Sequence, residues 1–181
     1  MIVTETNLAG CFIIEPIVFN DERGSFYESF HKTKFAEKTG LDIEFVQDNQ
    51  SRSQKGALRG LHFQENEFAQ AKLVRVVKGK VLDVVVDLRK ESQTFGKSFS
   101  IILSGENNKQ LFVPRGFAHG FYVLENETIF NYKCDNYYHK EAEKGIRYND
   151  SDLAIDWSLK DEKVILLEKD RQLMTFKQFC Q

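Results

Sequence analysis

The sequence predicts a mainly β fold of the sandwich, barrel or jelly-roll type, and three observations lead to this prediction. Short runs rich in Phe, Val and Ile follow one another closely, and the 181 residues include 16 Phe but only 2 Pro; aromatic and β-branched residues favour strands. Turn signals such as Lys78-Gly79-Lys80 and Gly105-Glu106-Asn107-Asn108 separate the runs. Helical patterns do not alternate with the runs, which weighs against a parallel α/β sheet. The length suits one domain over residues 1–181.

The predicted strands are short and follow in close succession. In chain order they span residues 25–30, 45–51, 58–64, 71–77, 81–88, 98–103, 109–113, 119–124 and 127–134. Alternation in the 81–88 run puts its apolar residues on one face and its two aspartates, Asp83 and Asp87, on the other. A short helix is expected from His31 to Lys38, because Gly40 supplies a glycine stop. Another helix is expected within residues 164–179.

The composition indicates a soluble, cytoplasmic protein without disulfides. A formal net charge of −2 weighs against a nucleic-acid or anionic-membrane binder, although a few local Arg or Lys could still hold a small anion. Cys11, Cys134 and Cys180 are too few and too far apart for a disulfide framework or a zinc site. Residues 1–6 lack a signal-peptide pattern, and no apolar run approaches the ~20 residues of a membrane span.

Several predicted strands carry polar residues on the face that should point inward. These residues are Gln47, Asn49, His62, Lys72 and Tyr132. Burying one unpaired polar group costs ~1–3 kcal/mol, so a row of them indicates a lumen lined for a polar ligand. Arg59 and His62 differ by three positions and would lie on opposite faces of an unbroken strand. Gly60 between them could mark a bulge that re-aims one side chain.

The segment Val113-Pro114-Arg115-Gly116-Phe117-Ala118-His119-Gly120-Phe121 resembles the Pro-x-Gly-x-x-His pattern of the cupin jelly rolls. In many cupins the His of this pattern joins two His and a Glu of an earlier motif around a metal ion. The earlier motif is missing here, since the other histidines are only His31, His62 and His139. A transition-metal site usually needs three or four protein ligands. We therefore expect no metal and no other cofactor.

Without a metal, the histidines suggest acid–base chemistry. A His has an unperturbed pKa near 6.5 and can act as a base at neutral pH. His62 is the candidate base, and either Asp170 or Asp83 could orient its ring. Tyr132 is the candidate acid, provided that its strand places it across the same pocket. Such a pair could remove a carbon-bound proton from one face of a substrate and return it to the other.

Taken together, the motifs resemble one family, the dTDP-4-dehydrorhamnose 3,5-epimerases, from about Gly10 to Asp170. The markers are Asp21-Glu22-Arg23-Gly24-Ser25-Phe26, Gln47-Asp48-Asn49, Leu58-Arg59-Gly60-Leu61-His62-Phe63-Gln64, Lys72-Leu73-Val74-Arg75-Val76, Asp87-Leu88-Arg89, Thr94-Phe95-Gly96, the segment Pro114 to Phe121, Tyr132-Lys133-Cys134, Tyr137-Tyr138 and Tyr148-Asn149-Asp150. Each marker alone is weak, but their shared order is specific.

The resemblance implies a metal-free, cupin-type jelly roll that works as a homodimer on a dTDP-linked 4-keto-6-deoxy hexose. It implies His62 as base, Tyr132 as acid, Asp170 as the partner of His62, and Lys72 and His119 as stabilisers of an enolate oxygen. Implied substrate contacts are Arg23, Phe26, Glu28, Gln47, Asn49, Arg59, His119, Tyr138, Glu143 and Lys169, with Tyr138 stacking on thymine.

Three other interpretations stay open on the sequence. A mono-epimerase or a ketoisomerase acting on a related nucleotide sugar would share the fold and the residues. A non-catalytic sugar-binding jelly roll would explain a polar lumen, although not a base facing an acid. A metal-dependent cupin is the third alternative.

Overall fold

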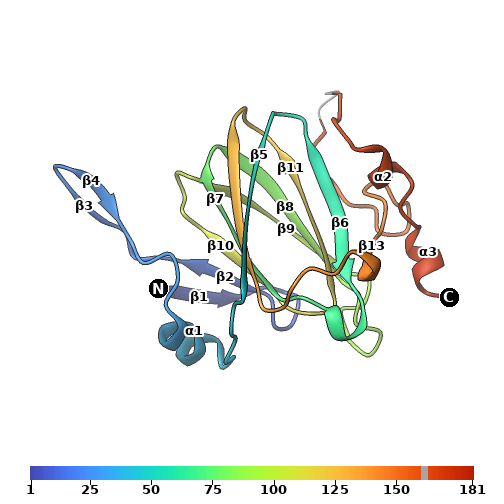
Figure 1. Ribbon diagram of the computed structural model, residues 1–181, viewed down its shortest axis with the longest axis horizontal. Helices are drawn as coiled ribbons and strands as arrows, with labels where there is room; N and C mark the ends of the chain where they lie inside the picture. Colours follow the sequence, from blue (N-terminus) through green and yellow to red (C-terminus); the bar gives the residue numbers. More distant parts are fainter. Residues whose placement is uncertain (160–162) are drawn as a thin grey trace.

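Two antiparallel β-sheets face each other in the computed structural model, which describes residues 1–159 and 163–181 (Figure 1). The strands are β1 (Ile2–Glu5), β2 (Phe12–Glu15), β3 (Phe19–Asp21), β4 (Gly24–Phe26), β5 (Gln47–Ser53), β6 (Leu58–Gln64), β7 (Lys72–Lys78), β8 (Lys80–Asp87), β9 (Ser98–Ser104), β10 (Gln110–Val113), β11 (Phe117–Val123), β12 (Thr128–Cys134) and β13 (Glu143–Gly145). One sheet has the order β1-β2-β10-β7-β12-β5 and the other β13-β6-β11-β8-β9, while β3 and β4 form a separate hairpin. The predicted mainly β jelly roll is confirmed.

Most predicted strands agree with the observed ones to within two residues at each end. The run 58–64 coincides with β6. Four short strands, β1, β2, β3 and β13, were not predicted. The strand predicted for residues 25–30 is wrong beyond Phe26, because Glu28 pairs with Lys34 and the Phe30 ring packs against Phe35. These contacts draw the chain toward the following helix instead of into a ladder.

The helices are few and short. Helix α1 (Lys32–Thr39) begins at His31, whose ring nitrogen accepts a hydrogen bond from the Lys34 amide, and ends at Gly40 with φ +73°. The expected glycine stop is therefore confirmed. The predicted C-terminal helix is two single turns, α2 (Glu168–Arg171) and α3 (Phe176–Phe179). None of the helices in the described part of the chain has the length and apolar character needed to cross a bilayer.

Three apolar clusters hold the layers together. One lies between the two sheets and includes Val74, Val85 and Phe121. A second lies on the outer face of the five-stranded sheet, where Leu61 and Val84 pack against the C-terminal segment. The third packs Phe35 of α1 and its neighbours against the six-stranded sheet. Strand β8 is consequently buried on both faces, which explains why its aspartates need partners.

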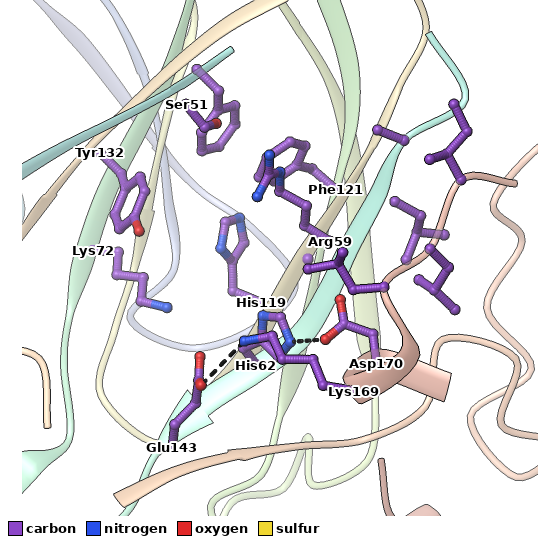
Figure 2. A pocket seen from close by; sticks show the side chains of 17 residues that line it. Ser51, Arg59, His62, Lys72, His119, Phe121, Tyr132, Glu143, Lys169 and Asp170 are labelled. Carbon is purple, nitrogen blue, oxygen red and sulfur yellow. Dashed lines mark hydrogen bonds and ion pairs between the residues drawn. The ribbon is translucent and has the colours of Figure 1, made fainter. Parts of the chain in front are cut away.

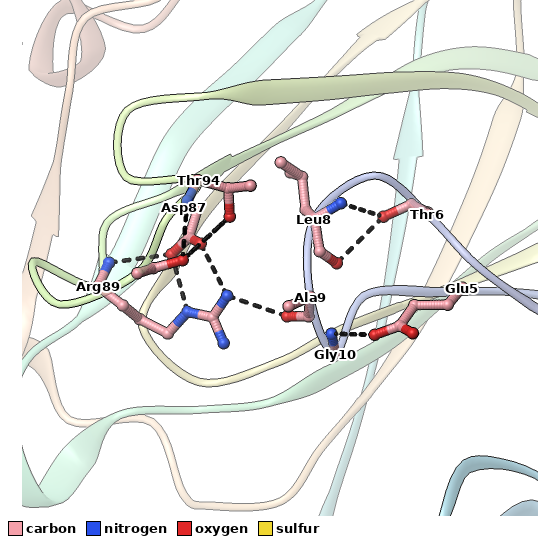
Figure 3. Close-up of polar contacts among 9 residues, drawn as sticks. Glu5, Thr6, Leu8, Ala9, Gly10, Asp87, Arg89 and Thr94 are labelled. Atoms are coloured by element: carbon pink, nitrogen blue, oxygen red, sulfur yellow. Dashed lines mark hydrogen bonds and ion pairs between the residues drawn. The ribbon is translucent and has the colours of Figure 1, made fainter.

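Asp87, at the end of β8, ties three parts of the chain together (Figure 3). Its carboxylate accepts hydrogen bonds from Nε and Nη2 of Arg89 at 2.8 and 2.7 Å, from Ser92 Oγ at 2.6 Å and from Thr94 Oγ1 at 2.7 Å. Arg89 Nη2 also donates to the carbonyl oxygen of Ala9 at 2.9 Å. Burial alone would raise the pKa of Asp87, but these hydrogen bonds outweigh it and hold the pKa well below its usual range.

We expect Asp87→Asn to lower the free energy of unfolding by about 3 kcal/mol at pH 7, since it leaves Arg89 without its carboxylate. Because the folded-state pKa is depressed, the carboxylate stabilises the fold in full above the pKa of an unfolded Asp, about 3.9. That contribution is lost as the pH falls below this value. Urea denaturation should therefore give a constant difference between the two proteins above about pH 5 and a shrinking difference toward pH 2.

Asp42→Asn is the matched control, because Asp42 is exposed and only approaches Lys32 at 3.6 Å. Its effect should stay below about 0.5 kcal/mol. An Asp87→Asn protein that is as stable as this control would show that the cluster contributes nothing to folding.

Candidate active site

A cavity of about 370 Å³ opens between the two sheets (Figure 2). Its lining includes eight of the residues predicted for the site: Arg59, His62, Lys72, His119, Tyr132, Glu143, Lys169 and Asp170. An adjoining pocket of about 220 Å³ shares His62, Lys72, Tyr132 and Glu143 with it and adds Gln47, Asn49 and Tyr138. The structure therefore brings eleven of the fourteen predicted residues together.

Strand alternation and register explain how the imidazole and phenol groups meet. Strands β6 and β11 pair so that His119 lies directly opposite His62. In the facing sheet, Tyr132 of β12 lies opposite Val74 of β7 and Asn49 of β5. Both candidate groups line the same cavity, as the sequence hypothesis required.

The predicted irregularity at Gly60 is confirmed. Between the pairs His62–His119 and Arg59–Phe121, β6 has one more residue than β11, so Arg59 and His62 can line the same cavity. Gly60 has φ +118°, and its bond to Leu61 is cis. A Cβ at this position would lie 2.5 Å from the Cα atom of Gly120 and 2.7 Å from the His119 carbonyl oxygen. Only glycine fits this approach of the two strands.

His62 has a carboxylate partner from the far end of the chain. Its Nε2 lies 2.9 Å from Oδ1 of Asp170, which comes from α2 and is 2% exposed. Of the two carboxylates considered for His62, Asp170 is therefore the one in contact. A buried carboxylate in this position fixes the ring orientation and stabilises the imidazolium when His62 takes up a proton.

Asp83, the other carboxylate considered for His62, pairs instead with His119. The Nε2 atom of His119 lies 2.9 and 3.1 Å from the two Asp83 oxygens. Burial raises the pKa of Asp83, while the charges of His119 and Lys72 and the hydrogen bond from His119 act against the rise. The site thus holds two imidazole–carboxylate pairs from different elements.

Lys72 and Tyr132 stand across the cavity from His62. Figure 2 shows the Tyr132 hydroxyl and the Lys72 amine directed into the space that the imidazoles also border. The Lys72 nitrogen lies 6.0 Å from the centre of the Tyr132 ring. Burial lowers the pKa of Lys72, against the charges of Cys134, Glu143 and Asp83. Burial raises the pKa of Tyr132, so its phenol keeps its proton at neutral pH.

Polar contacts organise the part of the site where the two pockets join. Glu143 accepts a hydrogen bond from the Tyr138 hydroxyl at 3.1 Å and approaches Lys169 Nζ at 3.3 Å. Gln47 donates to Asn49 Oδ1 at 2.9 Å and accepts from the Tyr138 amide at 3.0 Å. These groups offer hydrogen bonds and charge to a ligand longer than a single sugar.

The structure does not bring Arg23, Phe26 and Glu28 into the cavity of their own chain. Arg23 pairs with Asp21, Glu28 pairs with Lys34, and the Phe26 side chain is 68% exposed. They lie on or next to the β3–β4 hairpin, which projects away from the two sheets (Figure 1).

Nine lining residues of the main cavity were missed by the sequence reasoning, and Ser51, Phe121 and Phe130 are among them. Ser51 continues the inward row of Gln47 and Asn49, so strict alternation along β5 could have found it. The two phenylalanines looked like ordinary core residues, and they do stack on each other with ring centres 4.1 Å apart.

No group of three or more His, Cys, Asp or Glu side chains within residues 1–159 and 163–181 is arranged to hold a metal ion. His62 and His119 each face a single carboxylate.

Comparison with known proteins agrees with this geometry. The family model described as dTDP-4-dehydrorhamnose 3,5-epimerase matches residues 5–178. The dTDP-4-dehydrorhamnose 3,5-epimerase of Escherichia coli strain K12 is 50% identical over 175 residues, which cover 97% of this chain and 94% of the relative.

Two crystal structures are similar over nearly their whole length. The dTDP-4-dehydrorhamnose 3,5-epimerase of Elizabethkingia anophelis superposes with a TM-score of 0.94 at 54% identity, covering 98% of this chain and 97% of that one. The dTDP-6-deoxy-D-glucose-3,5-epimerase of Legionella pneumophila, in complex with dTDP-4-keto-L-rhamnose, superposes with a TM-score of 0.93 at 51% identity, covering 97% and 92%.

Proposed function

Because the chain belongs to the dTDP-4-dehydrorhamnose 3,5-epimerase family, we propose that it inverts C3 and C5 of dTDP-4-dehydro-6-deoxy-D-glucose to give dTDP-4-dehydro-L-rhamnose. The observation that carries the proposal is the single cavity bordered by His62, with its carboxylate partner, and by the phenol of Tyr132. The reaction is an isomerisation, so no electrons enter or leave and no redox cofactor is needed.

Proton removal is the first step. The C4 ketone of the substrate acidifies the hydrogens on C3 and C5. Neutral His62 takes one of these protons, and Asp170 stabilises the imidazolium that forms. The electron pair of the broken C–H bond moves onto the C4 oxygen, which becomes an enolate. Lys72 and His119, both lining the cavity, stabilise the negative charge by ionic and hydrogen-bonding contacts.

Proton return from the other face completes the inversion. The raised pKa of Tyr132 keeps its hydroxyl protonated, so it can donate to the enolate carbon. Solvent then reprotonates the phenolate and takes the proton from His62. Repeating the cycle at the second carbon inverts both centres, and the C4 ketone is restored each time.

We expect His62→Ala and His62→Asn each to lower turnover by at least about 10³-fold while the fold stays intact, because each removes the base. The assay is solvent-deuterium incorporation at C3 and C5 of dTDP-4-keto-6-deoxyglucose, followed by NMR. His31→Ala, which alters an exposed helix cap, is the control and should turn over normally. Wild-type rates of exchange in His62→Ala would refute the assignment.

Tyr132→Phe should still exchange deuterium through His62 but fail to complete inversion at C5, since the acid on the opposite face is gone. Product NMR measures this, and the same spectra from the wild type separate double inversion from a single inversion or from ketoisomerisation. Full conversion to the rhamno product by Tyr132→Phe would contradict the role of this residue. A wild type that binds the ketosugar without any exchange would favour the sugar-binding alternative.

We further propose that the protein is a homodimer in which each β3–β4 hairpin reaches the cavity of the partner. Arg23, Phe26 and Glu28 match substrate contacts by motif, yet they lie away from the cavity of their own chain. The hairpin region also exposes large apolar side chains, with Ile17 56% and Phe19 63% exposed. A second copy that covers them would account for both observations.

Mixing two inactive variants tests this arrangement. His62→Ala has an intact hairpin, and Arg23→Ala has an intact base. If the hairpin acts on the partner's cavity, a mixed dimer regains one complete site, and unfolding and refolding an equimolar mixture should restore about a quarter of wild-type turnover. If the hairpin acts on its own chain, mixing restores nothing. Each variant refolded alone is the control.

A further inference from the structure

Ser51 lines the cavity and carries an unpaired hydroxyl. Its Oγ is buried and has no hydrogen-bond partner in the structure, and the residue lines the main cavity. Leaving such a group without a partner costs about 1–3 kcal/mol, so buried hydroxyls are normally satisfied. Figure 2 shows Ser51 at the border of the space occupied by Tyr132 and Phe121.

The neighbouring inward residues of β5 all have partners, which singles out Ser51. Gln47 donates to Asn49, and Asn49 approaches Cys134 Sγ at 3.7 Å. Ser53 Oγ accepts from Nε and Nη2 of Arg59 at 3.3 and 3.2 Å. Ser51 is therefore the exception on this face of β5, because its hydroxyl has no hydrogen-bond partner among the described residues.

The position of Ser51 along β5 selects the sugar as its partner. Gln47 and Tyr138 line the adjoining pocket, whereas Ser51 lines only the main cavity. Four strand residues span about 13 Å, so one monosaccharide cannot reach both Gln47 and Ser51. Ser51 also lies opposite Phe130, which is two positions before Tyr132 and on the same face of β12. Ser51 thus lies on the same side of the cavity as Tyr132, the proposed proton donor.

We infer that Ser51 is a specificity-determining residue whose hydroxyl hydrogen-bonds a ring hydroxyl of the ketosugar. This inference rests on the proposed function. A 4-keto-6-deoxy hexose linked through C1 has only two free hydroxyls, on C2 and C3. The ring of Phe130, on the same strand as Tyr132, stacks on the ring of Phe121 from β11 of the facing sheet. The two rings give this part of the cavity an apolar surface that suits the C–H groups and the methyl of a deoxy sugar. Ser51 supplies the polar contact there that fixes the orientation of the ring.

The test compares Ser51→Ala with the wild type on three substrates: dTDP-4-keto-6-deoxyglucose and its 2-deoxy and 3-deoxy analogues. Deuterium exchange at C5, which all three share, gives kcat/KM, and calorimetry gives Kd. For the parent sugar, Ser51→Ala should lose roughly tenfold in kcat/KM, the size of one neutral hydrogen bond. For the analogue that lacks the bonded hydroxyl, the two proteins should perform alike. Ser100→Ala, on the exposed face of β9, should match the wild type on every substrate.

Each alternative result has a defined meaning. An equal loss on all three substrates, or no loss on any, overturns the inference. A loss accompanied by dissociation of the dimer in size-exclusion chromatography also overturns it, because Ser51 would then contact the partner chain. If the wild type binds the parent sugar but exchanges no deuterium, the proposed reaction fails, and the ratio of Kd values for the three sugars still decides the role of Ser51. Thermal unfolding should show Ser51→Ala at least as stable as the wild type, since it removes an unsatisfied group.

Discussion

The pairing of β6 with β11 is the constraint on which the site depends. It sets His62 opposite His119, and the extra residue at Gly60 lets Arg59 line the cavity beside them. The strands approach so closely at this point that Gly60 and Gly120 leave no room for a Cβ on either side. The register of one strand pair therefore fixes the geometry of three functional side chains, because rigid strands hold them more firmly than a loop could.

Buried polar groups are costly, and this protein offsets the cost by giving them partners from distant elements. Asp170 from α2 satisfies His62, and Asp83 from β8 satisfies His119. Burial shifts the pKa values of Lys72 and Tyr132 in opposite directions: it lowers the pKa of the lysine and raises the pKa of the phenol. Both shifts are toward the neutral forms, as burial in a medium of low dielectric constant dictates.

Alternation along the strands was enough to predict much of the fold and of the site. It placed Asn49, His62, Lys72 and Tyr132 inward, because each lies in a long run with a clear period of two. It could not predict the strands β1, β2, β3 and β13, which have only three or four residues. The pairing of Asp170 with His62 spans 108 positions and depends on tertiary packing that no local pattern encodes. It came from the family resemblance instead. The same limit explains why Asp83 was considered as a partner of His62, although it contacts His119.

The C-terminal segment covers the outer face of the five-stranded sheet and delivers Lys169 and Asp170 to the cavity. It is anchored by isolated bridges that join Ile165 to Ala57 and Met174 to Ile146. His62 therefore has its carboxylate only while this segment is docked on the sheet. A form with both sheets folded and the segment detached would lack the imidazole–carboxylate pair and the Lys169 amine at the cavity. Docking of the segment and competence for proton transfer are thus coupled.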